Sequence, residues 1–241
     1  MPPAPAIELT GVRKDYHGLR PLRIDRLTVG EDEIVALAGL DLAASEILTS
    51  LVTGATLAEA GEVRIFGRAT SDLENASAWL AFVEQFGIVS ERVALLDAFS
   101  VEQNLTIPFT LDLHAPDPAI LDAVTALAVE VGLGAGELDL PMTARPPLLN
   151  ARVRLARASA LDPRVLLLEH PTAGLARPDV PVFAADVRRV ARRRKLAVLA
   201  VTGDAEFARA VADRVLAVDP SNGTVRAQGI WRRLLGRVRL S

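Results

Sequence analysis

The sequence contains no cysteine, which excludes a disulfide framework, thiolate metal ligands and thiol catalysis. Its three histidines, His17, His114 and His170, lie far apart along the chain and lack metal-ligand spacing. No apolar run approaches the roughly 18 residues that a transmembrane helix needs, so we expect no segment that spans a bilayer. The lack of cysteine fits a protein of a reducing, intracellular compartment.

Charge and length set further limits. The formal net charge of −3 provides no general attraction to nucleic acid or to anionic membranes, so we expect no nucleic-acid partner. The first residues, MPPAPAIEL, lack the basic start and apolar core of a signal peptide. Half of the 241 residues are apolar, which is enough for a sizeable core, and we expect 1–241 to form a single domain.

The central stretch is 34–54, IVALAGLDLAASEILTSLVTG. Its apolar start predicts a buried strand, a turn follows from Gly39, and a helix is expected as far as Gly54. Strand, tight loop and helix are the setting of a phosphate-binding loop, whose motif is G-x-x-x-x-G-K-[ST]. Where the motif has its second glycine, lysine and hydroxyl residue, this chain has Ala44, Ser45 and Glu46.

The rest of the chain alternates between strand and helix patterns. Residues 7–30 and 61–67 predict antiparallel strands, and 79–85 reads as a further strand that ends at Gln85. Residues 100–150 predict a helical insert, whereas 150–220 alternates as expected for a parallel sheet. The fold class is therefore α/β, with a P-loop NTPase-like, mostly parallel sheet core, an antiparallel β subdomain and a helical insert. The basic, amphipathic segment 230–240 predicts a terminal helix.

This order of segments resembles the ATP-binding cassette of ABC transporters over essentially the whole chain. Three stretches carry the resemblance: GEVRIFG at 61–67, ARVRLARASALDPRVLLLEHPTAGLA at 151–176 and VTGDAEFARAVADRVLAV at 201–218. The resemblance implies ATP with Mg²⁺ as ligands and assigns positions to them. They are Tyr16 on the adenine, Gly39, Asp41, Ser45 and Glu46 at the phosphates, Gln85 in the Q-loop and Glu169 as the Walker B acid at the metal.

The departures from the family pattern all fall on its chemistry. The Walker A lysine is absent, and the signature motif falls on 145–149, where none of its residues is present. His170 occupies the position of the catalytic glutamate, and Gly203 that of the switch histidine. Ala176 occupies the position of the D-loop aspartate. We therefore assign no catalytic residue, although a histidine such as His170 is able in principle to act as a base.

A carboxylate at Glu46 would face the negative charge of a bound nucleotide. Like charges about 4 Å apart repel by roughly 4 kcal/mol at an effective dielectric constant near 20. If Glu46 instead held Mg²⁺, its interaction with the nucleotide would become attractive. Our hypothesis is that Asp41, Ser45 and Glu46 instead satisfy the helix N-terminus, so that the loop folds without nucleotide and no cofactor is expected.

The leading interpretation is a catalytically degenerate cassette, not an active enzyme, that serves as a structural or regulatory subunit of an ABC transporter. Its partners would be an active cassette and a transmembrane permease subunit, whose coupling helix the family docks in a groove near 85–105. It would then lie in the cytoplasm, peripheral on the inner face of the cell membrane. Two alternatives remain: a working ATPase with an unorthodox site, and a soluble regulator unrelated to transport.

Overall fold

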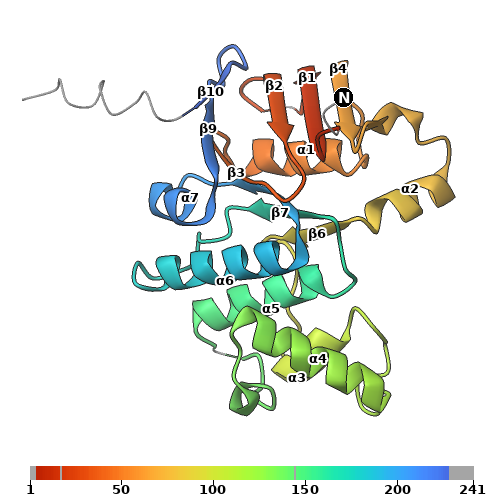
Figure 1. The fold of residues 1–241 in the computed structure, drawn as a ribbon, viewed down its shortest axis with the longest axis vertical. Helices are drawn as coiled ribbons and strands as arrows, with labels where there is room; N and C mark the ends of the chain where they lie inside the picture. Colours follow the sequence, from red (N-terminus) through yellow and green to blue (C-terminus); the bar gives the residue numbers. More distant parts are fainter. Residues whose placement is uncertain (1–3, 17, 144, 228–241) are drawn as a thin grey trace, which may run out of the picture.

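Two sheets form the framework of the protein, seen in a computed structural model that describes residues 4–16, 18–143 and 145–227 (Figure 1). The larger sheet has the order β10-β9-β3-β8-β7-β6, and the smaller one has the order β2-β1-β4-β5. Strands β6, β7, β8, β3 and β9 are parallel to one another, whereas β10 and the smaller sheet are antiparallel. The predicted α/β class, with a mostly parallel core and an antiparallel part, is confirmed. The strands are β1 Ile7–Lys14, β2 Leu22–Val29, β3 Ile34–Ala38, β4 Ala60–Ile65, β5 Arg68–Ala69, β6 Phe86–Val89, β7 Val165–Glu169, β8 Ala197–Val201, β9 Arg214–Val218 and β10 Val225–Ala227.

Helices cover both faces of the larger sheet. One face carries α1 and, beyond it, the antiparallel sheet, while α3 to α7 lie on the other face (Figure 1). Because both faces are covered, the inner strands are almost continuously apolar, and alternate residues enter opposite cores: Leu166 and Leu168 on one side, Val165 and Leu167 on the other. The helices are α1 Leu42–Val52, α2 Ala76–Val83, α3 Val101–Thr106, α4 Pro118–Val131, α5 Pro147–Ser159, α6 Asp179–Arg194 and α7 Ala205–Val211.

The prediction of a strand over 79–85 is wrong. This segment belongs to α2, whose N-cap Asn75 accepts a hydrogen bond from the backbone of Ala78 at 2.9 Å. The next strand, β6, begins only at Phe86. Apolar periodicity does not separate a short strand from a short helix, and the capping asparagine was the local signal that decided between them.

Buried ion pairs join α4, α5 and α6 to one another. Asp186 of α6 is almost fully buried and accepts hydrogen bonds from Arg152 of α5 at 2.8 Å and from Arg189 at 2.6 Å. Arg194, at the end of α6, pairs with the buried Glu130 of α4 at 2.6 Å. The predicted helix over 230–240 lies outside the described residues, in which no helix is long and apolar enough to cross a membrane.

We expect Asp186→Asn to destabilise the protein by about 3 kcal/mol, because it leaves Arg152 and Arg189 without their buried counter-charge. Asp162→Asn is the matched control, since Asp162 also pairs with an arginine but its side chain is 91% exposed. That control should change the free energy of unfolding by less than about 1 kcal/mol. Urea denaturation measures both values. Equal effects would contradict the conclusion that the buried ion pairs of Asp186 stabilise the fold more than the exposed pair of Asp162.

Candidate functional site

A pocket of about 310 Å³ opens at the carboxyl end of the parallel strands. Three segments meet there: the start of α1, the loop after β6 and the end of β7. In open α/β sheets this edge is where ligands bind. The pocket is lined by Leu42, Ser45, Glu46, Ser90, Glu91, Arg92, Glu169, His170 and Ala173.

The turn between β3 and α1 is short. Helix α1 begins at Leu42, so only 39–41 separate it from β3. Gly39 has φ +97°, and a Cβ at this position would collide with the carbonyl oxygen of Val218 in β9. The glycine is therefore required by the close approach of two strands, and it is the only residue of 39–46 with positive φ.

The N-terminus of α1 is capped by one side chain of its own sequence. Asp41 is its N-cap, and its Oδ1 accepts a hydrogen bond from the backbone N–H of Ala44 at 2.8 Å. The Ser45 hydroxyl donates to the carbonyl of Leu42 at 2.8 Å, and Glu46 points to an arginine across the pocket. The hypothesis that three side chains satisfy this helix end therefore holds for Asp41 alone.

Arg92, which the sequence analysis did not single out, joins the two acids of the pocket. Its Nη2 lies 2.7 Å from Oε1 of Glu169, its Nε lies 3.1 Å from Oε2, and its Nη1 lies 2.8 Å from Oε1 of Glu46. Burial disfavours ionisation of Glu169, but hydrogen bonds from Arg92 and from the hydroxyls of Thr49 and Ser90 outweigh it. The pKa of Glu169 is therefore below its ordinary value.

His170 follows Glu169 in a strained backbone conformation. Its φ is +42°, its N–H donates to the carbonyl of Val201 at 2.8 Å, and its buried Nε2 has no hydrogen-bond partner among the described residues. Gly203 follows β8, and a Cβ at this position would contact none of the described residues beyond its chain neighbours. The residue after it, Asp204, accepts from Thr172 at 3.2 Å and caps α7, so this carboxylate joins the loops that follow β7 and β8.

Tyr16 lies close to the turn before α1. It lines a small pocket of about 60 Å³ together with Gly39, Leu40 and Asp41, and it packs against the core beneath the antiparallel sheet. Burial and the negative charge of Asp41 both raise the pKa of Tyr16. Tyr16 therefore lies beside the turn that precedes α1, and its place on an adenine stays a prediction.

Gln85 does not belong to the site. Its carbonyl accepts hydrogen bonds from the backbone N–H groups of Arg164 and Val165 at 2.9 and 3.0 Å, at the amino end of β7. Because β6 runs parallel to β7, Gln85 lies at the edge opposite the pocket. The prediction failed because the strand was placed too early, and the residues that follow β6 into the pocket are Ser90, Glu91 and Arg92.

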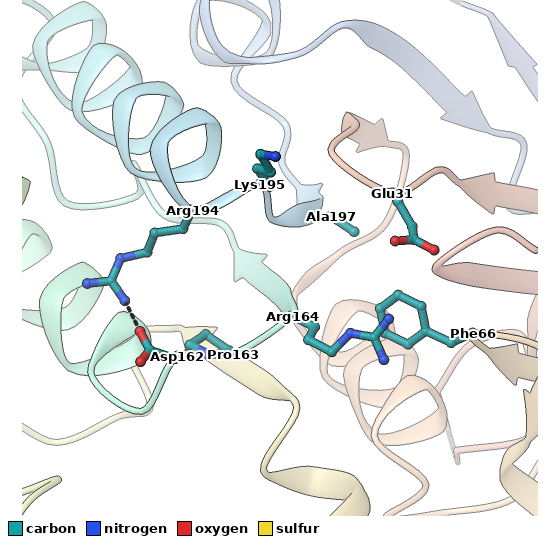
Figure 2. Close-up of a pocket in the computed structure, with 8 residues that line it drawn as sticks. All are labelled: Glu31, Phe66, Asp162, Pro163, Arg164, Arg194, Lys195 and Ala197. Carbon is teal, nitrogen blue, oxygen red and sulfur yellow. Dashed lines mark hydrogen bonds and ion pairs between the residues drawn. The ribbon is translucent and has the colours of Figure 1, made fainter. Parts of the chain in front are cut away.

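The edge near Gln85 has a pocket of its own, of about 360 Å³ (Figure 2). In it the guanidinium of Arg164 lies 3.5 Å above the ring of Phe66, and Arg194 pairs with Asp162. This cation–π contact joins the turn between β4 and β5, which holds Phe66, to the residue that precedes β7.

Comparisons with known proteins agree with this architecture. The chain is 31% identical over 239 residues to the lipoprotein-releasing system ATP-binding protein LolD of Anaeromyxobacter dehalogenans (strain 2CP-C), covering 95% of this chain and 96% of that protein. The chain belongs to the ATP-binding cassette family. It is also 26% identical over 230 residues to the methionine import ATP-binding protein MetN of Brucella abortus (strain 2308), of which it spans 61%. No family model matches the sequence.

Two solved structures share the fold of this cassette. CbiO1 from Clostridium perfringens, part of the ABC transporter complex cbiONQ, superimposes with a TM-score of 0.80 at 18% identity, covering 97% of this chain and 91% of that chain. The ATP-binding cassette MJ0796, in a dimeric post-hydrolysis state bound to ADP and Pi, gives a TM-score of 0.74 at 20% identity. That match covers 92% of this chain and 97% of the other.

The residues of this cassette do not fit Mg²⁺-ATP in the way that a P-loop does. The N–H of Ala44, at the position of the motif's second glycine, already bonds Asp41, and Glu46 and Glu169 already hold a guanidinium. At the signature stretch, Pro146 caps α5 and Pro147 begins it, so both positions lack an N–H.

The lowered pKa of Glu169 predicts a pH-dependent stability. A carboxylate with a lower pKa in the folded state stabilises above its ordinary pKa of about 4.5, and this contribution disappears as pH falls through the folded value. We expect Glu169→Gln to cost about 2 kcal/mol at pH 7 and progressively less below pH about 4.5. Glu62→Gln is the control, since Glu62 also pairs with an arginine but is exposed. Denaturation at several pH values tests this, and a constant difference down to pH about 3 would contradict it.

Proposed function

We propose that this ABC transporter ATP-binding subunit is a non-hydrolysing cassette, a structural or regulatory partner of an active cassette. The observation that carries the proposal is the capped N-terminus of α1, where Asp41 bonds the N–H of Ala44, one of the groups that a P-loop would offer to phosphate. The absence of the lysine and the presence of Glu46 add unfavourable charge for a nucleotide. His170 then has no bound phosphate to act on.

The proposed partners are a transmembrane permease subunit and a second cassette. A groove of about 370 Å³ lies between β6, α5 and the residues after α3, and its lining is mostly apolar. It lies beside 85–105, where the resemblance places the docked coupling helix. CbiO1 is part of a transporter complex and MJ0796 forms a dimer, which supports both partnerships. The subunit would then be cytoplasmic and peripheral on the inner face of the cell membrane. The groove is lined by Val83, Glu84, Phe86, Gly87, Ile88, Val93, Ile107, Pro108, Arg157, Ala158, Leu161 and Pro163.

Nucleotide binding is tested by thermal unfolding of the full chain with and without about 5 mM Mg²⁺-ATP. A ligand at about 100 times its Kd stabilises a protein by about 2.7 kcal/mol, which is several degrees of Tm for a chain of this size. We expect a shift of less than about 1 °C, equal to that with Mg²⁺ alone. A shift of several degrees, or ATP turnover that is lost in His170→Ala, would favour a working ATPase instead.

The contact with the permease subunit is tested by introducing a charged side chain into the groove. Leu161 is 62% exposed and lines the groove, whereas Leu111 is 89% exposed and lies outside it. We expect Leu161→Glu to reduce co-purification with a membrane subunit from native membranes at least about tenfold, since burying one charge costs more than 1.4 kcal/mol. Leu111→Glu should leave it unchanged. Recovery of the wild-type chain free of any membrane protein would favour a soluble regulator.

A further inference from the structure

A guanidinium lies between two carboxylates of the pocket. Arg92 bonds both oxygens of Glu169 and one oxygen of Glu46, all four contacts lying between 2.7 and 3.1 Å. Glu46 belongs to α1 and Glu169 ends β7. We propose that Arg92 is a built-in cation that replaces the metal of this site, joins α1 to β7 without nucleotide and excludes divalent cations.

The charges of the pocket require such a group. The side chain of Glu169 is only 4% exposed, and an ionised carboxylate that is removed from water needs a positive partner. Glu46 brings a second negative charge to the same guanidinium. The planar fork of an arginine matches a carboxylate with two parallel N–H donors, as Arg92 does with Glu169.

A metal ion and Arg92 compete for the same oxygens. Mg²⁺ binds carboxylate oxygen at about 2.1 Å in a near-octahedral shell. The oxygens that would supply this shell already accept hydrogen bonds from Nε, Nη1 and Nη2 of Arg92. Binding of the metal would therefore require the guanidinium to leave, and its departure would cost the ion pairs with both acids.

Arg92 is presented by a loop that is itself held in place. Arg157 donates to the carbonyl of Ala94 at 2.7 Å, and Arg154 donates to that of Val93 at 3.3 Å. Farther along, the buried Asn104 both accepts from and donates to the backbone of Leu96. Because these side chains hold the backbone of the loop, the backbone beside Arg92 loses little further freedom when the guanidinium binds the two acids.

The test uses the full chain without nucleotide, with Mn²⁺ alone as the probe, detected by electron paramagnetic resonance. We expect the wild type to bind no Mn²⁺ at millimolar concentration. Arg92→Gln should lower Tm by about 5 °C in metal-free buffer, bind one Mn²⁺ and recover about half of the loss when Mn²⁺ is added. Adding Glu169→Gln to Arg92→Gln should abolish both the binding and the recovery.

Two further variants keep the test decisive if Arg92→Gln folds poorly. Arg92→Lys retains the charge but not the fork, so it should still exclude Mn²⁺ while its Tm lies between those of the wild type and Arg92→Gln. Arg64→Gln is the matched control, because Arg64 makes the same two-pronged contact with Glu62 on an exposed surface. It should change neither Tm nor Mn²⁺ binding.

Several results would overturn the proposal. They are stoichiometric Mn²⁺ binding by the wild type, Mn²⁺ binding by Arg92→Lys equal to that of Arg92→Gln, or a loss of Tm in Arg92→Gln with no Mn²⁺ bound. The last result would make Arg92 a structural ion-pair partner only. The inference goes beyond the proposed function, since neither ATP nor a membrane partner enters the experiment, and either can fail while the other stands.

Discussion

The carboxylate of Glu169 is buried at the end of a central strand, and neighbouring side chains compensate its negative charge. A buried ionised acid is stable only with a positive partner and further hydrogen bonds. Arg92 provides the charge from the loop after β6, and Thr49 and Ser90 provide hydrogen bonds from α1 and the same loop. One acid thereby joins three segments that are far apart in the sequence.

Charged side chains of the chain itself occupy this end of the sheet. The carboxylate of Asp41 bonds the N–H of Ala44 at the start of α1, and the guanidinium of Arg92 lies between the acids of Glu46 and Glu169. In the function that we propose, these groups take the places of phosphate and metal. The fold is stabilised by two apolar cores on opposite faces of the parallel sheet.

The loop after β6 connects the pocket with the proposed docking groove. Arg92 points into the pocket, while its neighbour Val93 lines the groove, and Arg157 both lines the groove and holds the carbonyl of Ala94. A membrane subunit seated in the groove would therefore contact a loop that the arginines of α5 already immobilise. This arrangement suits a subunit that provides a rigid surface.

The sequence by itself determined the family, the α/β class and most of the elements. Buried parallel strands such as β3, β7 and β8 are continuous apolar runs between turn residues, so local pattern was enough to place them. It also identified Asp41 as a residue at a helix start. The helix at 76–83 was misread because its apolar residues fit either periodicity, and that error carried Gln85 to the wrong end of β6.

Only the tertiary structure decided the role of Arg92. Its partners, Glu46 and Glu169, lie on other elements, and the pairing exists because β6 and β7 are adjacent in the sheet while α1 begins at the same edge. Local sequence carries no record of such a contact, because an ion pair depends on distance in space and on burial. For the same reason, only the register of β6 shows that Ser90, Glu91 and Arg92 line the pocket and that Gln85 does not.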